Sequence, residues 1–371
     1  MINEAEPVNK THKKLRRKLL IPGLVLAVAS LSVSADRSID LSAKVKITSV
    51  QEESLQNFFT ESLSATNTET QQTSNLIQKL EDVKAEKAAY ALKDNRDVSM
   101  DCAKIIASPQ GYLAVYHTNN NTVFEGRLAL SKDLSHWEYI TTLDTYASQL
   151  TIFSIPNGGY IVGEEKNVFS DGNDNGSELD FKYYKNIDNL FSARADKDLL
   201  IPRTQSEWNE GTPNIYSVTF TNPNNPDISQ SIIEVGFHYN DLSKEGDREA
   251  NGVIKNFSSW NSQKDKNINS MFEKMGIKDI GDRDFFSYNG HPYIIYEARK
   301  TKNFADWRTY LFDVSNDTLT MLNIQTQGES FAFANPTVSI INGKLIATDF
   351  IPKEGSTSGE SGEMLYSLPL N

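Results

Sequence analysis

The sequence predicts an all-β fold, a five-bladed β-propeller, and two observations support this prediction. First, a short apolar strand, a Gly or Pro turn and a more hydrophobic strand recur five times between Asp101 and Leu370. The paired strands are 101–106 with 111–116, 149–153 with 159–163, 213–218 with 232–237, 284–287 with 292–296, and 335–340 with 343–347. Second, hydrophobic residues make up 38% of the chain and aromatic residues 10%, which favours many half-buried strands over a helical core. Hairpin repeats at intervals of about 40–70 residues are typical of propeller blades, whose innermost strands begin around one axial pocket.

The repeats differ in how complete they are. The first and fourth continue into third and fourth strands, at 124–130 and 136–140 and at 307–314 and 319–322. The fifth offers three strands, and the alternating segment 41–47 is a candidate for the missing outer strand; the alternative is a disordered stalk. Residues 241–280 of the third repeat are rich in Lys, Asn and Asp, so we expect an insertion with a helix near 268–275.

The N-terminus has the pattern of an export signal. Basic residues at 13–18 precede an apolar stretch at 19–35 that ends in small residues. We therefore expect a signal peptide or anchor at 1–35, a linker at 36–97 with a helix at 75–92, and the propeller at 98–371. The protein would then be periplasmic, secreted or associated with the cell envelope, and membrane-bound only if 19–35 stays as an anchor.

Charge and cysteine content narrow the possible partners. The formal net charge is −12, and the basic residues of 10–18 lie in the leader, so the rest of the chain repels phosphate backbones. Nucleic acid is therefore not an expected partner. Cys102 is the single cysteine, so no internal disulfide can form.

The segment Ser131-Lys132-Asp133-Leu134-Ser135-His136-Trp137 carries a family resemblance. It resembles the turn between outer blade strands in five-bladed glycosidases of the arabinanase and β-xylosidase type, glycoside hydrolase family 43 and its relatives. The resemblance implies a structural role, in which Asp133 caps the turn and Trp137 packs between blades.

The same resemblance implies the catalytic residues. Glu210-Gly211-Thr212-Pro213 is similar to the string whose Glu is the family's general acid, although Thr212 is inserted. Asp101 opens the first blade, where the family places its general base, and such a pair performs inverting hydrolysis. Blade two departs from the family pattern, because Ala147-Ser148-Gln149 stands where a third acid is expected. The alternatives are a Glu-Gly turn before a strand and an Asp that caps strand amides.

The start of the fourth blade offers further candidates. Asp284 could assist catalysis, while Asp282 and Arg283 could contact a sugar hydroxyl or carboxylate. The aromatic residues Trp208, Phe285 and Tyr288 could stack on sugar faces.

A polar segment in the second repeat resembles a calcium loop. Oxygen-bearing side chains alternate there around a Gly, and the candidate ligands are Asp171, Asn173, Asn175, Glu178 and Asp180. The alternative is a polar hairpin tip. No His pair has zinc spacing, and no organic cofactor is expected.

These patterns together predict an exported glycoside hydrolase-like propeller that acts on arabinose- or xylose-type glycosidic bonds with an Asp/Glu pair. One alternative is a lectin-like propeller that binds carbohydrate and has lost the blade-two acid. A second is an envelope-associated interaction protein held by residues 19–35.

Overall fold

The computed structural model describes residues 70–84, 88–120, 123–170, 173–244, 246–357 and 359–370, all within one compact unit of the chain. The described residues form five antiparallel sheets in sequence order, which confirms the five-bladed propeller. The predicted leader at 1–35 and the strand at 41–47 lie outside the described residues and stay predictions. Among the described residues, no helix has the length and apolar character needed to cross a membrane.

The blades are consecutive meanders. Blade 1 holds β1 (Asp101–Ser108), β2 (Gly111–Asn120), β3 (Val123–Ser131) and β4 (Trp137–Thr145). Blade 2 holds β5 (Ala147–Ser154), β6 (Tyr160–Ser170), β7 (Asn173–Tyr184) and β8 (Lys197–Ile201), with the short helix α2 (Ile187–Phe191) between its last two strands. Blade 3 holds β9 (Glu210–Phe220), β10 (Ser231–Asp241), β11 (Gly246–Lys255) and β12 (Ser259–Lys264).

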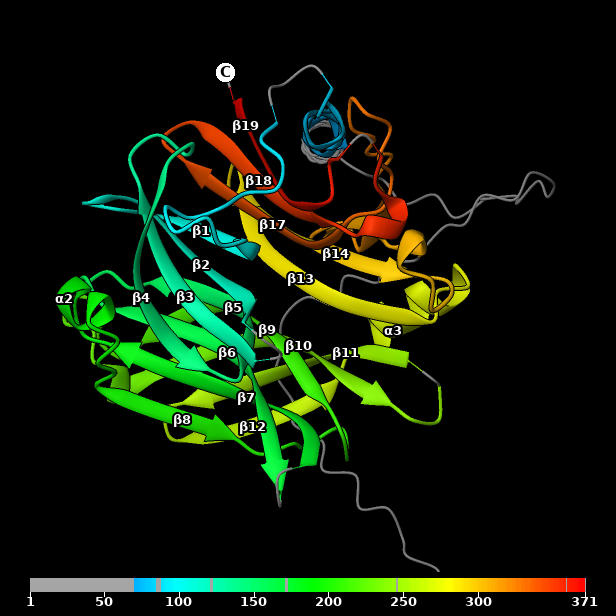
Figure 1. The fold of residues 1–371 in the computed structure, drawn as a ribbon. Coiled ribbons are helices and arrows are strands. Elements are labelled where there is room, and N and C mark those ends of the chain that lie inside the picture. Colours follow the sequence, from blue (N-terminus) through cyan, green and yellow to red (C-terminus); the bar gives the residue numbers. More distant parts are fainter. Residues whose placement is uncertain are drawn as a thin grey trace, which may run out of the picture. The chain divides into compact units, whose positions relative to one another are not determined.

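The last two blades differ in strand number. Blade 4 holds β13 (Asp279–Tyr288), β14 (His291–Arg299), β15 (Arg308–Asp313) and β16 (Thr318–Met321). Blade 5 holds only β17 (Ala334–Ile341), β18 (Lys344–Ile351) and β19 (Gly362–Pro369). The first strands β1, β5, β9, β13 and β17 contact one another in a closed ring, so each blade begins at the same end of one axis (Figure 1).

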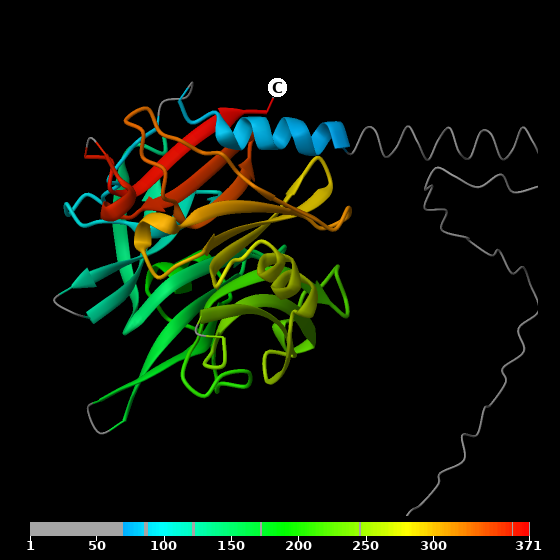
Figure 2. The same cartoon turned by 90° about the vertical axis from the view of Figure 1, so that its right-hand side faces the viewer.

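The N-terminal segment covers the open edge of blade 5. Residues 70–81 are helical, and Leu76, Leu80 and Val83 are buried against blades 4 and 5; Figure 2 shows this helix beside β19. Ala89 and Leu365 exchange backbone hydrogen bonds of 2.8 and 2.9 Å, so the chain is extended there. The expected helix at 75–92 is therefore wrong in its second half, because the apolar residues near 88–92 pack from an extended segment along β19.

The expected insertion at 241–280 is also wrong, because this segment contains β11 and β12, the outer strands of blade 3. The helix expected near 268–275 is confirmed as α3 (Lys266–Lys274). Its N-cap is Asp265, whose carboxylate accepts hydrogen bonds from the backbone N–H groups of Asn267 and Ile268.

The turn between β3 and β4 has the structure that its sequence predicts. Asp133 Oδ1 accepts the backbone N–H groups of Ser135 and His136 at 2.8 and 2.9 Å. Trp137 is 2% exposed and packs in a cluster that includes Ile341 and Ile346 of blade 5. Both roles, the turn cap and the packing between blades, are confirmed.

The turn cap leads to a stability prediction. Replacing Asp133 by Ala removes the acceptor for two turn amides, and we expect a small fall in the free energy of unfolding, since the site is exposed. Chemical denaturation measures this fall as a lower midpoint with an unchanged slope. Asp188→Ala, an exposed carboxylate in α2 outside this turn, is the control, and an equal shift in both variants would contradict the capping role.

Candidate functional site: the axial carboxyl cluster

Each inner strand begins with an irregular turn of backbone. The pairing of the first and second strands shifts register there in all five blades. Cys102, Gln149, Thr212 and Asn335 occupy the bulges of blades 1, 2, 3 and 5 with φ of 56°, 50°, 45° and 51°, and Asp282 holds the corresponding place in blade 4. Such non-glycine backbone is strained, and strain of this kind clusters at binding sites.

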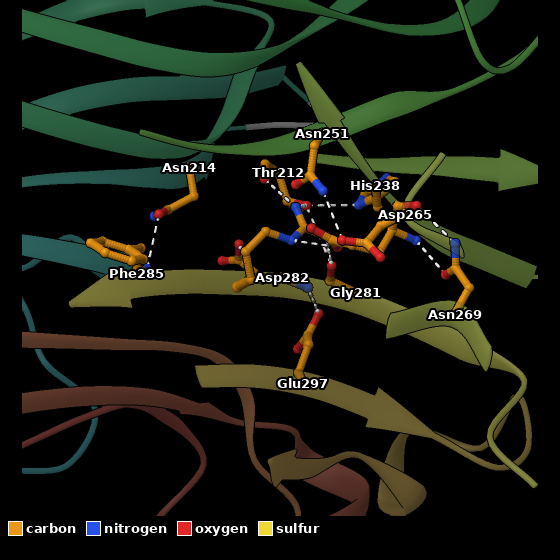
Figure 3. Close-up of polar contacts among 12 residues, drawn as sticks. Thr212, Asn214, His238, Asn251, Asp265, Asn269, Gly281, Asp282, Phe285 and Glu297 are labelled. Carbon is orange, nitrogen blue, oxygen red and sulfur yellow. Dashed lines mark hydrogen bonds and ion pairs between the residues drawn. The ribbon is translucent and has the colours of Figure 1, made fainter. Parts of the chain in front are cut away.

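Side chains from neighbouring strands fix the amides of these bulges. The pairs are Cys102 N–H to Glu363 at 2.9 Å, Gln149 N–H to His117 at 3.2 Å, Thr212 N–H to Glu165 at 3.1 Å, and Asp282 and Asn335 N–H to Glu297 at 2.8 and 2.6 Å. One carboxylate, Glu297, thus holds the starts of two inner strands, and Figure 3 shows it directed at the start of β13. Gly281 makes this possible, since a Cβ there would lie 1.8 Å from Glu297 Oε1.

Two amide side chains meet across the axis at this end. Asn335 Nδ2 of blade 5 donates to Gln149 Oε1 of blade 2 at 2.9 Å, and blades 2 and 5 are not neighbours in the ring. Asn335 Nδ2 also lies 3.5 Å from Asp282 Oδ2. These three side chains therefore close the axis and form the base of a site at the N-terminal ends of the inner strands.

Four carboxyl groups, Asp101, Asp282, Glu297 and Glu363, form what we call the axial acid cluster. Burial and the charges of all four raise the pKa of the neighbouring Cys102 thiol. Asp282 is half-buried, and burial, with Glu297 and Asp284 nearby, raises its pKa well above the usual range although Arg283 opposes the shift. Asp101 is also half-buried, and burial raises its pKa although Ser99 Oγ donates a hydrogen bond to it. The cluster therefore offers two partly accessible carboxyl groups that hold protons more firmly than free ones.

A second polar layer lies one turn further along the axis. Asp284 accepts hydrogen bonds from Lys104 Nζ, from Asn214 Nδ2 at 2.7 Å and from the backbone N–H of Val338 at 2.7 Å. Asp284 is 1% exposed. This residue, expected to assist catalysis, instead joins three inner strands at the middle of the axis.

Glu210 lies at the start of β9 with its side chain fully buried. Its Oε1 accepts the backbone N–H groups of Thr204, Gln205 and Ser206, the first at 2.6 Å and the last at 3.1 Å. The carboxylate therefore fixes the loop before β9 and has no exposed surface to offer a substrate. Trp208, on that same loop, is 45% exposed.

The other expected sugar contacts are dispersed. Arg283 is buried, pairs with Glu249 at 2.9 Å and donates to Thr212 and to the Gly281 carbonyl, so it has no free donor fork for a ligand (Figure 3). Phe285 and Tyr288 lie toward the opposite end of the axis. Phe285 is half-buried there, while Tyr288 is buried among apolar residues of blades 4 and 5.

The expected calcium ligands do not face a shared centre in the described part of the loop. Asp171 and the side chain of Asn173 lie outside the described residues. The Asn175 carbonyl accepts a hydrogen bond from Arg203, Glu178 lies 4.0 Å from the same guanidinium, and Asp180 contacts Lys182 instead. Calcium binding at this loop stays a prediction.

Among the described residues, Asp144, Glu164 and Asp180 lie close enough to hold a metal ion together. The Lys182 ammonium contacts all three carboxylates, so this lysine already supplies the positive charge that the acids require.

Sequence reasoning missed the side chains that fix the bulges, although a signal was present. The second strand of each repeat ends its apolar run with a titratable residue, and these are His117, Glu165, His238, Glu297 and Asp349. A charged or imidazole side chain at the same point of five apolar strands indicates a shared role, because burial of such groups is costly unless they are paired.

Glu297 makes a pH dependence of stability testable. Burial raises its pKa from 4.5 to about 7, although two backbone amides oppose the shift. Since the folded state binds this proton more tightly than the unfolded chain, stability is highest below pH 4.5 and falls as pH rises toward 7. We expect a loss of roughly 2 kcal/mol between pH 5 and pH 7 from this group. Denaturation across that range measures the loss, and Glu297→Gln should flatten it; an unchanged slope in that variant would contradict the assignment.

The geometry defines the class of protein. The described chain has the five-bladed propeller fold of glycoside hydrolases, with a carboxyl cluster at the end of the axis where the inner strands begin. No protein-family model and no curated protein sequence matches the chain.

Solved structures share this fold. One described as a glycoside hydrolase has a TM-score of 0.55 at 11% identity, over 79% of this chain and 94% of that one. Another, described as a complex of BT0996 with RGII, has a TM-score of 0.54 at 11% identity with the same coverage. At this identity, the likeness establishes the fold and leaves the active residues to be argued from the geometry.

Proposed function

We propose that the protein is a glycoside hydrolase whose reactive carboxyl pair is Asp101 and Asp282. One observation carries the proposal: Asp282 is a half-buried carboxyl group on the axis, with a raised pKa and a backbone amide fixed by Glu297. A carboxylic acid that keeps its proton near neutral pH is what the departure of a sugar leaving group requires.

The roles follow from position. Asp282, protonated, donates its proton to the glycosidic oxygen as the bond from that oxygen to the anomeric carbon breaks. Asp101, ionised, takes a proton from the water that attacks the anomeric carbon from the other face, so the configuration inverts. The proposal keeps Asp101 in the role expected from the sequence and moves the proton donor from Glu210 to Asp282, because Glu210 is fully engaged by loop amides.

Exposed aromatic side chains support a sugar ligand at this end of the axis. Tyr146, directly before β5, is 42% exposed and forms an edge-to-face pair with Phe169, whose ring centroid lies 4.9 Å away. Trp208 is exposed in the loop before β9. Exposed aromatic rings beside carboxyl groups suit the apolar faces and hydroxyl edges of carbohydrates.

A second candidate function is carbohydrate binding without hydrolysis. The hydrogen bond between Gln149 and Asn335 favours it, because blade two contributes a neutral amide to the axis and not an acid. Such a protein would hold a sugar at the same site through neutral contacts.

The test is incubation of the purified full chain with aryl arabinofuranosides, aryl xylosides, arabino- and xylo-oligosaccharides and RGII fragments. Turnover with inversion, followed by proton NMR of the released sugar, is the expected result. Binding by calorimetry without turnover would select the lectin-like function. The absence of both turnover and binding would contradict both candidates.

A further inference from the structure

A cavity of about 510 Å³ opens at the end of the axis opposite the axial acid cluster. All five inner strands line it with the residues of their C-terminal halves. Its volume lies within the range of small-molecule sites, and neither the proposed hydrolysis nor the bulges at the strand starts use it.

The cavity is separate from the proposed catalytic site. Its floor includes Lys104 and Asp284, which belong to the polar layer at the middle of the axis. Asn214 completes that layer from blade 3 with its 2.7 Å hydrogen bond to Asp284. Because this layer joins strands across the axis, a ligand in the cavity does not reach Asp101 or Asp282.

The floor carries an available hydrogen-bond donor but no net charge. Lys104 is 8% exposed, and its ammonium donates to Asp284 and to the Val338 carbonyl at 3.1 Å. An ammonium has three donors, and the described residues accept two of them. The adjacent Asp284 carboxylate neutralises the lysine, so an anionic or a cationic ligand gains little from this floor.

The walls are aromatic and the rim carries hydroxyl groups. The rings of Tyr216 and Phe285 lie 5.6 Å apart at an interplanar angle of 37°, and Phe153 adds a third half-buried ring. At the mouth, Ser154 and Ser287 are exposed. Apolar walls, hydroxyls at the rim and one buried donor suit a compact neutral ligand with an apolar face and several hydroxyls.

We propose that this cavity binds a neutral monosaccharide unit, with its C–H face against Phe285 and Tyr216 and one hydroxyl accepting a hydrogen bond from Lys104. The site is distinct from the proposed catalytic one and does not depend on it. A product sugar or the terminal unit of a longer glycan has the required chemistry.

The experiment is titration of the full chain with free arabinose, xylose, glucose and galactose, followed by calorimetry and saturation-transfer NMR. Ser154→Trp fills the mouth from an exposed position, and Ser258→Trp, exposed and outside the cavity, is its matched control. We expect Ser154→Trp to weaken binding at least tenfold, while Ser258→Trp and Asp282→Asn bind as the wild type does.

Three results would overturn the proposal: folded wild type that binds none of these sugars, unchanged affinity in Ser154→Trp, or loss of binding in Asp282→Asn. If circular dichroism shows that Ser154→Trp is not folded, Phe285→Leu replaces it, with the same expected loss. Turnover in the hydrolysis assay should be the same in Ser154→Trp and wild type, so failure of this site and failure of the catalytic proposal give different patterns.

Discussion

Replacing Lys182 by methionine should lower the free energy of unfolding by about 3–5 kcal/mol, because it removes the cation from a buried group of carboxylates. Lys182 Nζ lies 2.8 Å from Asp144 Oδ2 and 2.6 Å from Glu164 Oε1, and it also contacts Asp180. The Lys182 side chain is 8% exposed and that of Glu164 is 0% exposed. Asp144 comes from blade 1 and the other residues from blade 2, so the lysine also joins two blades.

The charges explain the size of this effect. Burial opposes the charged lysine, but Glu164 and Asp180 outweigh it and raise the pKa of Lys182. Methionine fills a similar volume without charge, so the variant tests the cation and not the packing. The carboxylates then have to ionise without a partner or take up protons. The loss should therefore be smaller at pH 4 than at pH 8, since protonated acids need no cation.

Lys166→Met is the matched control. Lys166 lies 2.6 Å from Asp144 Oδ1 on the neighbouring strand, but its side chain is 25% exposed, so we expect a loss of about 0–1 kcal/mol. Urea denaturation of the three proteins at both pH values measures the difference. Equal losses in the two lysine variants would contradict the role of Lys182 as the buried cation.

The fold was predictable because each blade begins with two strands whose apolar residues are nearly continuous. The prediction failed in blade 3, where β11 reads Gly246-Asp247-Arg248-Glu249 before its apolar residues. Arg248 and Glu249 are buried, and Glu249 is paired with Arg283 of the next blade. Hydrophobic periodicity cannot detect a strand whose buried positions carry paired charges, since their pairing is a tertiary property.

The site was predictable in its location but not in its members. The sequence places acids at the starts of the inner strands, and the axial acid cluster lies there. Which acid is accessible depends on the bulges, because one residue of backbone separates the half-buried Asp282 from the buried Asp284 layer. A left-handed backbone at Cys102, Gln149, Thr212 and Asn335 has no mark in the sequence, since none of these residues is a glycine.

Asp282→Asn should lower turnover of the best substrate by a factor of about 10²–10⁴, the usual contribution of a positioned general acid. Asparagine keeps the size of the side chain and the backbone N–H that donates to Glu297, but it has no proton to give to the leaving group. In the wild type, turnover should fall as pH rises through the raised pKa of Asp282, because ionisation removes that proton. This decline at high pH should be absent from the residual activity of the variant.

Controls separate chemistry from folding. Asp188→Asn changes an exposed carboxylate in α2 and should leave turnover unchanged. Glu210→Gln should instead lower stability, because the amide group replaces a carboxylate that accepts three loop N–H groups. Aryl substrates with a good leaving group need less protonation, so they should lose less turnover in Asp282→Asn than unactivated oligosaccharides do. If Glu210→Gln abolishes turnover in folded protein while Asp282→Asn retains it, the proton donor is Glu210, and the loop that buries it must open during the reaction.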